Sequence, residues 1–193
     1  MNYLPRTIQP VIEEASKFFK IVMVSGMRQV GKSTLLKQLS SDKRTIISFD
    51  DINNLESAKN APLQFLQLNP PPCFFNQVQR VPEIFKALKI SVDSRSEKGL
   101  YWLSGSQKLS LMSQVSDALP GRLMNFELWP FSIYEIAGKG LEQKPYLPSF
   151  SLSSNLPILD PADTWNAVFQ GFWPELKKAT ETERSCFFRS LVD

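Results

Sequence analysis

The sequence predicts an α/β fold, with a mostly parallel sheet of about five strands and helices on both faces. Strand and helix patterns alternate at short intervals over much of the chain. The earliest strand pattern, Ile21-Val22-Met23-Val24, is continuously apolar, which is typical of a strand buried on both faces. A glycine-rich loop joins it to a helix. Such alternation favours a parallel sheet because each connecting helix packs back onto the sheet.

Apolar spacing and turn residues place the elements in order. Strands are expected at residues 21–24, 45–49, 73–75, 100–103 and 124–128. Helices are expected at residues 3–19, 35–39, 55–68, 82–92, 109–115 and 131–136. Pro62 breaks the helix over 55–68. Pro82 fits the first turn of its helix, because proline lacks the N–H that a first turn leaves unpaired.

The texture of the chain changes after residue 137. Four of the fourteen prolines and a serine cluster fall within residues 138–163, which is typical of a loop or linker. Helical patterns return at 165–172 and 181–191. We therefore expect an N-terminal domain over 1–137, a linker over 138–163 and a short helical C-terminal remnant over 164–193.

Composition excludes several classes of site. The 193 residues include no histidine, which excludes Ser-His-Asp triads and histidine-built zinc sites. Cys73 and Cys186 lie far apart in apolar surroundings, which indicates buried thiols in a reducing compartment rather than a disulfide. No apolar run approaches the ~18 residues of a membrane span, so we expect no membrane segment and a cytoplasmic location.

Charge is concentrated at the start of the chain. Residues 1–44 hold eight Lys/Arg against three Asp/Glu, a balance of +5, within a net charge of +3. A basic segment of this kind suits either nucleic acid or a bound polyphosphate. The glycine-rich loop inside it favours the polyphosphate.

That loop, Gly26 to Ser33, fits the pattern G-x-x-x-x-G-K-[ST] between a strand and a helix. Gly26 and Gly31 permit backbone angles that direct N–H groups at phosphate oxygens. Lys32 supplies a point charge to the outer phosphates, and the Ser33 hydroxyl is the expected Mg²⁺ ligand. The expected nucleotide-binding residues are Gly26, Met27, Arg28, Gln29, Val30, Gly31, Lys32, Ser33 and Thr34.

Further motifs extend the pattern in order along the chain. They are 28–33 (RQVGKS), 49–51 (FDD), 71–83 (PP to QRVPE), 104–107 (SGSQ), 119–122 (LPGR), 128–132 (LWPFS) and 171–175 (GFWPE). On these residues the chain resembles the prokaryotic AAA-type ATP-binding proteins whose ATPase domain precedes a nuclease-like C-terminal domain of unknown function. The resemblance implies a P-loop ATPase fold with ATP and Mg²⁺ as ligands.

Two departures from this family bear on activity. In the family the third strand ends in Asp-Glu, where the Asp belongs to the magnesium shell and the Glu polarises the attacking water. Here the same positions are Asn76 and Gln77, whose amides carry no charge and accept no proton. The resemblance therefore implies ATP binding with weak or absent hydrolysis. The family's C-terminal domain is also largely missing, so we expect Trp173, Phe187 and Phe188 to expose apolar surface or pair between chains.

Other candidate residues carry two interpretations each. Ser106 is a polar sensor of the terminal phosphate or a helix cap. Arg122 is an arginine finger, acting on its own or a neighbouring subunit, or a surface arginine, and action on a neighbour implies a homo-oligomer. Asp50 and Asp51 replace the lost carboxylates near magnesium, or one of them caps the next helix. Arg28 touches phosphate or folds outward.

Three functions remain in view. The leading one is an ATP-binding AAA-like protein impaired in hydrolysis, acting as a nucleotide-dependent switch or a truncated ATPase. The second is an active Mg²⁺-dependent ATPase or kinase that uses other carboxylates, with Asp51 as the test residue. The third is a nucleic-acid-associated interaction module. Trp102, Phe126, Trp129 and Phe131 are interpreted as core residues rather than base-stacking ones. No Asn-Lys-x-Asp sequence is present, so adenine is expected rather than guanine.

Overall fold

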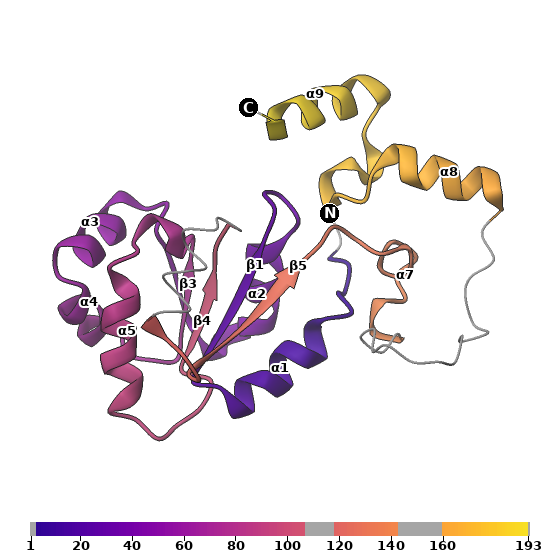
Figure 1. Ribbon diagram of the computed structural model, residues 1–193. Helices are drawn as coiled ribbons and strands as arrows, with labels where there is room; N and C mark the ends of the chain where they lie inside the picture. Colours follow the sequence, from indigo (N-terminus) through magenta and orange to yellow (C-terminus); the bar gives the residue numbers. More distant parts are fainter. Residues whose placement is uncertain (1–2, 107–117, 143–159, 193) are drawn as a thin grey trace. The chain divides into compact units, whose positions relative to one another are not determined.

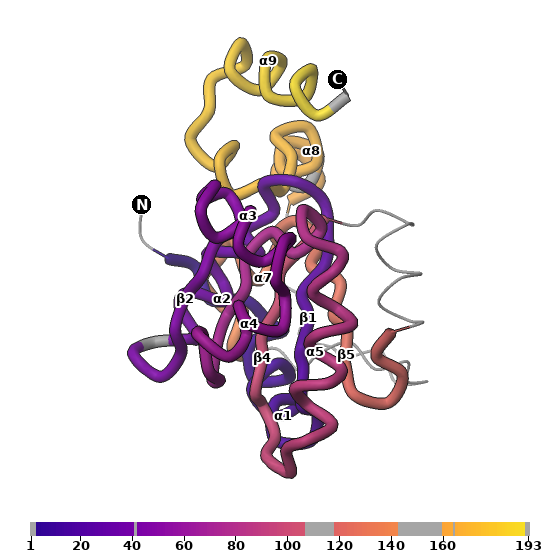
Figure 2. Tube along the Cα trace, turned by 90° about the vertical axis from the view of Figure 1, so that its left-hand side faces the viewer, coloured from indigo at the N-terminus to yellow at the C-terminus, as the bar shows by residue number. Residues whose placement is uncertain are grey.

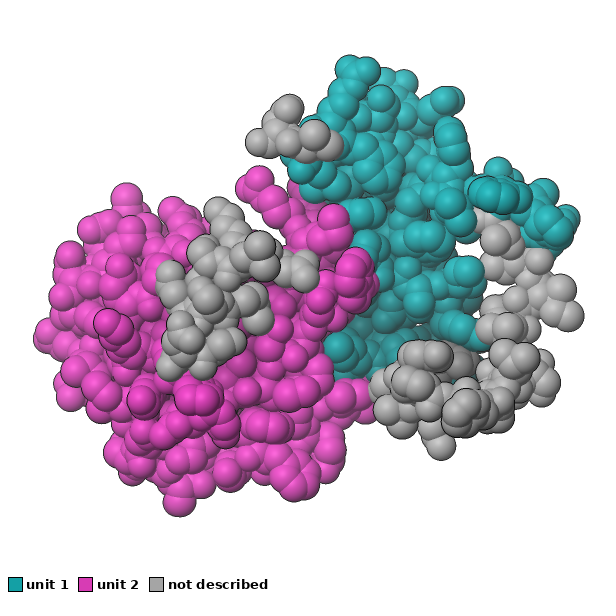
Figure 3. Space-filling view, in the orientation of Figure 1, with its two compact units in different colours: residues 1–8, 130–193 teal, residues 9–129 magenta. Residues whose placement is uncertain are grey.

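The computed structural model describes residues 3–106, 118–142 and 160–192. The helix expected at 109–115 and most of the expected linker lie outside these residues. The chain divides into two compact units, one over 9–129 and one formed by 1–8 together with 130–193 (Figure 3). This division falls after Trp129, whereas the sequence-based boundary falls after residue 137.

The unit over 9–129 is built on a five-stranded sheet in the order β2-β3-β4-β1-β5, and every pair in it is parallel (Figure 1). The strands are β1 (Ile21–Gly26), β2 (Thr45–Ser48), β3 (Cys73–Asn76), β4 (Tyr101–Ser104) and β5 (Leu123–Leu128). All six residues of β1 are buried. The predicted parallel α/β sheet is confirmed.

Helices cover both faces of this sheet (Figures 1 and 2). One face carries α3 (Ile52–Asn60), α4 (Pro62–Leu68) and α5 (Ile84–Asp93), and the other carries α1 (Gln9–Phe18) and α2 (Lys32–Ser40). Short 3-10 turns, η1 (Ser41–Lys43) and η2 (Val78–Arg80), follow α2 and β3. The main apolar core joins alternate strand residues such as Met23, Phe75 and Leu103 to the α3–α5 layer.

Proline residues explain where two of the predicted helices begin or break. The helix expected over 3–19 begins only at Gln9, because Pro10 is accommodated in a first turn and not in a helix interior. The helix expected over 55–68 is two helices that meet at Ala61 and Pro62, as the Pro62 break predicts. The first of them begins earlier than expected, at Ile52.

The aromatic residues split between core and surface. Trp102 is only 4% exposed, and its Nε1 donates to Ser16 Oγ at 2.8 Å, which confirms its core role. Trp129 is 61% exposed, so its interpretation as a core residue is wrong. It follows directly on β5, where the chain leaves the sheet and the alternation that buries strand residues ends.

The second unit contains α7 (Ile133–Ile136), η3 (Gly140–Glu142), α8 (Pro161–Gln170), η4 (Pro174–Lys178) and α9 (Glu181–Val192). Trp173, Phe187 and Phe188 pack edge-on against one another with ring centroids 5.7–6.1 Å apart. They therefore partner one another within the unit. Phe188 is still 37% exposed, so the expected apolar exposure is confirmed for this ring, and pairing between chains stays a prediction. Trp165 and Phe169 on α8 are more exposed, at 72% and 75%.

The two cysteines differ in burial. Cys73 is buried, whereas Cys186 on α9 is exposed. The prediction of buried thiols is therefore confirmed for Cys73 and wrong for Cys186.

A buried ion pair joins the start of the chain to α7 in this unit. Arg6 Nε lies 3.1 Å from Glu135 Oε1, with both side chains almost fully buried. The Glu135 carboxylate also accepts from the main-chain N–H groups of Thr7 and Ser132, each at 2.8 Å. Ser132 and Glu135 form a capping box at the start of α7.

Among the described residues, none of the helices has the length and apolar character that a membrane span requires.

Candidate nucleotide-binding site

The glycine-rich loop leaves the carboxyl end of β1 and leads directly into α2. Three of its residues have positive φ: Gly26 (+147°), Gln29 (+61°) and Gly31 (+95°). A Cβ on Gly26 would lie 2.3 Å from the carbonyl oxygen of Leu128 on β5. Glycine at position 26 is thus required by the neighbouring strand as well as by the loop conformation.

The first turn of α2 faces this loop. The first helical main-chain bond runs from Leu35 N to Gly31 O at 2.9 Å, so the N–H groups of Lys32, Ser33 and Thr34 precede it. Unpaired N–H groups and the positive end of the helix dipole together favour an anion at this point. The loop and helix therefore have the arrangement that binds phosphate.

Lys32 lies inside the loop. Its Nζ donates to the carbonyl oxygens of Gly26 at 2.9 Å and Met27 at 2.5 Å. Burial lowers the pKa of Lys32 to about 8, because a low-dielectric setting disfavours the ammonium form. The loop thus holds the Lys32 ammonium against its own carbonyl groups. Arg28 and Thr34 have exposed side chains, and Val30 is buried.

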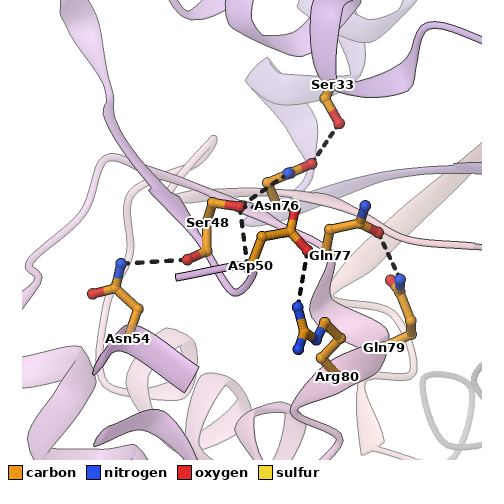
Figure 4. A network of polar contacts seen from close by, with 8 residues as sticks. All are labelled: Ser33, Ser48, Asp50, Asn54, Asn76, Gln77, Gln79 and Arg80. Atoms are coloured by element: carbon orange, nitrogen blue, oxygen red, sulfur yellow. Dashed lines mark hydrogen bonds and ion pairs between the residues drawn. The ribbon is translucent and has the colours of Figure 1, made fainter. Parts of the chain in front are cut away.

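Asn76 is the polar centre of the site. It ends β3 and is buried, and its Oδ1 accepts hydrogen bonds from Ser33 Oγ at 2.5 Å and Ser104 Oγ at 2.6 Å. Its Nδ2 donates to Ser48 Oγ at 3.2 Å (Figure 4). Asn76, at the position where the resemblance implies a magnesium-shell aspartate, therefore contacts the expected Mg²⁺ ligand, Ser33, directly. Ser104 and Ser48 reach it from the adjacent strands β4 and β2.

Ser48 connects this centre to a carboxylate. Ser48 Oγ lies 3.3 Å from Asp50 Oδ2 and also 3.3 Å from the Asp50 main-chain N. Arg80 Nη1 donates to Asp50 Oδ1 at 3.0 Å, in an ion pair that is about half exposed (Figure 4). Asp50 is consequently linked to Asn76 through one hydroxyl group.

Asp51, by contrast, caps α3. Its Oδ1 accepts from the main-chain N–H groups of Asn53 at 2.8 Å and Asn54 at 3.3 Å. The prediction that one of the two aspartates caps the following helix is confirmed. The hypothesis of a replacement carboxylate therefore falls on Asp50 and not on Asp51.

Gln77 takes a left-handed backbone conformation, with φ of +64°. Its Oε1 accepts from Gln79 Nε2 at 2.6 Å, so its side chain is directed at η2 (Figure 4). Gln79 Oε1 in turn accepts from the main-chain N–H of Ser106 at 3.2 Å. Ser106 is thus tied to Gln77 through Gln79, while the serine that touches Asn76 is Ser104.

Arg122 lies at the amino ends of the strands, at the edge of the sheet opposite the one that carries the loop. Its carbonyl oxygen accepts from Ile21 N at 3.1 Å, at the end where β1 and β5 begin to pair. The loop lies at the other end of β1, after Gly26, which pairs with Leu128. Six strand residues at about 3.3 Å each separate these edges by about 20 Å. Action of Arg122 on the loop of its own chain is therefore ruled out by the parallel register, and action on a neighbouring subunit stays a prediction.

Arg122 has a local partner. Its Nε and Nη2 donate to the two carboxylate oxygens of Asp93, at 2.5 and 3.0 Å. These hydrogen bonds raise the pKa of Arg122 and lower that of Asp93. Since the pair is partly exposed to solvent, it contributes little to stability.

Sequence reasoning gave no individual role to four residues of this site, which are Ser48, Gln79, Arg80 and Ser104. Asp50 was considered as a replacement carboxylate, but its link to Asn76 through Ser48 was not expected. A signal was present: polar residues at the carboxyl ends of three strands meet at one edge of a parallel sheet, which is where ligands bind in α/β folds. Within the described ranges, no group of three or more His, Cys, Asp or Glu side chains could hold a metal ion.

Comparison with known proteins agrees with this geometry. A family model described as an AAA domain matches residues 18–137, which is well over half of the chain. An uncharacterized protein of Mycobacterium tuberculosis and one of Mycobacterium bovis are each 27% identical to it over 141 residues, covering 70% of this chain and 32% of the relative. The chain thus spans about a third of the length of these relatives. With its parallel sheet and its glycine-rich loop before α2, this chain belongs to the ATP-binding AAA domain family.

Proposed function

We propose that this chain binds ATP with Mg²⁺ in the loop formed by residues 26–34, and that it hydrolyses ATP weakly or not at all. It then acts as a nucleotide-dependent switch or as the ATP-binding part of a larger ATPase. The observation that carries the proposal is the contact of Ser33 with Asn76, because the side chain beside the expected Mg²⁺ ligand is a neutral amide and not a carboxylate.

The binding half of the proposal rests on the loop and α2. Lys32 is positioned inside the loop, and the first-turn N–H groups of α2 face the same space. The Ser33 hydroxyl and the Asn76 amide oxygen are uncharged hard-oxygen donors, a type that Mg²⁺ accepts when phosphate oxygens and water complete its coordination. The residues present therefore fit Mg²⁺–ATP, with phosphate supplying the negative charge that the protein does not.

The hydrolytic half depends on what the two amides cannot do. Neither Asn76 nor Gln77 accepts a proton at neutral pH, and the Gln77 oxygen already accepts from Gln79. Loss of a positioned general base typically lowers a rate by ~10² to 10⁴. Bound Mg²⁺ would polarise the phosphate oxygens, but the side chains that hydrogen-bond to Asn76 in the described part of the chain are the hydroxyls of Ser33, Ser48 and Ser104, which are poor acceptors for the proton of water.

A second candidate is an active ATPase that uses Asp50. The observation in its favour is the Ser48 hydroxyl, which lies within hydrogen-bonding distance of both Asn76 and Asp50. On this alternative, Mg²⁺-dependent phosphate release by the native chain is abolished by Asp50→Asn. Asp51→Asn leaves that activity in place and only weakens the α3 cap.

The proposal is tested by calorimetric titration of ATP and a non-hydrolysable analogue, each with Mg²⁺. The native chain is expected to bind both ligands with similar affinity, and Lys32→Ala to weaken binding at least ~10-fold, the effect of losing a charge-assisted contact. Lys37→Ala is the matched control, because Lys37 lies on the same helix with an exposed side chain. Absence of ATP binding by the folded native chain would overturn the proposal.

Two partners, a neighbouring subunit and nucleic acid, also remain proposals. Arg122 acts on a neighbouring subunit only if the chain forms a homo-oligomer, which sedimentation with and without ATP would reveal. Nucleic acid stays a proposal that rests on the basic N-terminal segment, in which Lys and Arg outnumber Asp and Glu.

A further inference from the structure

A second concave site lies on the α1–α2 face of the sheet, at the edge where the strands begin. It is a cavity of about 440 Å³ bordered by α1, the end of α2, η1 and the segment before β4. Its charged walls are formed by Glu13 and Lys17 on α1, Lys43 and Arg44 after α2, and Lys98. Four cations thus face one carboxylate.

Most of this positive charge is not neutralised. Lys17 is paired with Glu14 on the same helix at 2.6 Å. None of the ion pairs in residues 3–106, 118–142 and 160–192 involves Lys43, Arg44 or Lys98. Lys43 and Lys98 have exposed side chains on separate segments of the rim. A concave surface with an excess of one charge concentrates ions of the opposite sign.

Arg44 forms the rigid part of the cavity. Its guanidinium lies 4.0 Å from the ring centroid of Trp102, so the stacked ring fixes its plane. Its two hydrogen bonds are long, 3.5 Å to Leu100 O and 3.4 Å to Ser16 Oγ, which leaves most of its five N–H donors weakly used. Burial lowers the pKa of Arg44 to about 10, so the group stays charged at neutral pH.

The cavity is separate from the nucleotide loop. Helix α2 begins at Lys32 beside that loop and ends at Ser40 in the cavity wall. Nine residues at about 1.5 Å each place the two sites about 13 Å apart along this helix. No residue that lines the cavity belongs to the loop at 26–34 or contacts Asn76.

We propose that this basic cavity is a second anion site, which binds phosphate groups through the planar donors of Arg44 and the point charges of Lys43 and Lys98. A stacked arginine whose donors make only long hydrogen bonds, with exposed lysines around it, matches the geometry of phosphate esters. The phosphates come either from a single-stranded nucleic acid or from a free polyphosphate. Trp102 is buried beneath Arg44, so base stacking on this ring contributes nothing.

The test uses the full chain carrying Lys32→Ala, which removes the loop cation, so that failure of ATP binding at the loop does not affect the result. The probes are a fluorescein-labelled oligothymidylate, followed by anisotropy, and inorganic tripolyphosphate, followed by calorimetry. The test variant is Lys43→Gln with Lys98→Gln. The charge-matched control is Lys59→Gln with Lys86→Gln, on exposed sites of α3 and α5 over the opposite sheet face.

We expect the test variant to weaken binding of at least one probe ~10-fold or more at low salt, and the control to weaken it less than ~2-fold. If the oligonucleotide is the ligand, the slope of log affinity against log salt falls by about 1.4 for the two lost contacts. Arg44→Lys, which keeps the charge but loses the planar fork, is expected to weaken binding as well.

The outcomes separate the two sources and can refute the site. Binding of the oligonucleotide without tripolyphosphate assigns the cavity to a nucleic-acid backbone, and the reverse assigns it to a small polyphosphate. The proposal is overturned if neither probe binds, or if the test and control variants lose affinity equally. Thermal denaturation of each variant shows that the fold is retained, since both double substitutions are at exposed positions.

Discussion

The Ser33 hydroxyl donates to the amide oxygen of Asn76 at 2.5 Å. An amide oxygen only accepts and an amide nitrogen only donates, so Asn76 gives this network a direction. Ser33 and Ser104 donate to Oδ1, while Nδ2 donates to Ser48, whose own proton is then available for Asp50. The Ser33 oxygen keeps its lone pairs for a cation. An aspartate at 76 would reverse the bond to Ser48 and set two carboxylates on either side of that hydroxyl.

The first prediction concerns turnover. Asn76→Asp with Gln77→Glu is expected to raise Mg²⁺-dependent phosphate release ~10² to 10⁴-fold, because a charged magnesium shell and a proton acceptor return together. Each single substitution is expected to restore less. Steady-state phosphate release measures the effect, and equal turnover by the native chain would show that these positions do not limit hydrolysis.

The second prediction concerns pH. The pKa of Lys32 is lowered from 10.5 to about 8, so the unfolded chain holds this proton more tightly and folding stability rises with pH between these values. ATP binding requires the ammonium form. Affinity is therefore expected to fall about five-fold from pH 8 to pH 9, with proton uptake visible by calorimetry in buffers of different ionisation enthalpy. Lys32→Arg, which stays charged, should remove this dependence, and a flat profile for the native chain would contradict it.

The third prediction concerns the steric requirement for glycine at position 26. Gly26→Ala is expected to destabilise the fold by about 3 kcal/mol or more, because its Cβ would meet Leu128 O at 2.3 Å. Gly121→Ala is the control: its φ is also positive, at +71°, but nothing lies within 4 Å of the added atom. It should cost about 1 kcal/mol. Thermal denaturation compares the two, and equal losses would mean that the contact with β5 is unimportant.

The fourth prediction concerns the buried Arg6–Glu135 pair. Glu135→Gln leaves the Arg6 charge buried without a counterion, which typically costs about 3–5 kcal/mol. We expect faster hydrogen exchange over residues 3–8 and 130–142. Glu142→Gln, at an exposed position of the same unit, should leave exchange unchanged. Slow exchange in Glu135→Gln would show that the pair is dispensable.

The fifth prediction follows from the position of Arg122. Arg122→Ala is expected to leave ATP affinity unchanged, because the residue lies at the far edge of the sheet and is paired with Asp93. If the chain acts as an oligomer, the same substitution lowers turnover of the Asn76→Asp, Gln77→Glu protein only at concentrations where subunits associate. A change in the ATP affinity of the monomer would contradict the observed placement.

Local signals explain which elements were predicted well. The apolar run of β1, the spacing of Gly31, Lys32 and Ser33, and the helix break at Pro62 each depend on neighbours a few residues away. The strand ends were placed within a residue or two, and the α3 cap at Asp51 was among the interpretations considered. The capping box of Ser132 and Glu135 is equally local. The motif at 128–132 includes Ser132, but no helix cap was predicted there.

Long-range contacts explain what was missed. Asn76 meets Ser33 from 43 residues away, and Ser48 and Ser104 each from 28. These meetings depend on the strand order, in which β3 lies between β2 and β4. Periodicity along the chain carries no information about which strands are neighbours, so polar strand ends indicated a shared site but not that Ser48 and Ser104 would contact Asn76.

By itself, the sequence determined that a phosphate-binding loop follows a buried strand and that amides stand at positions 76 and 77. Only the tertiary structure decided that Asn76 joins Ser33 to Asp50 through Ser48, and that Arg122 lies at the other edge of the sheet. The physical reason is that backbone spacing sets local geometry, whereas parallel pairing sets which strand ends converge.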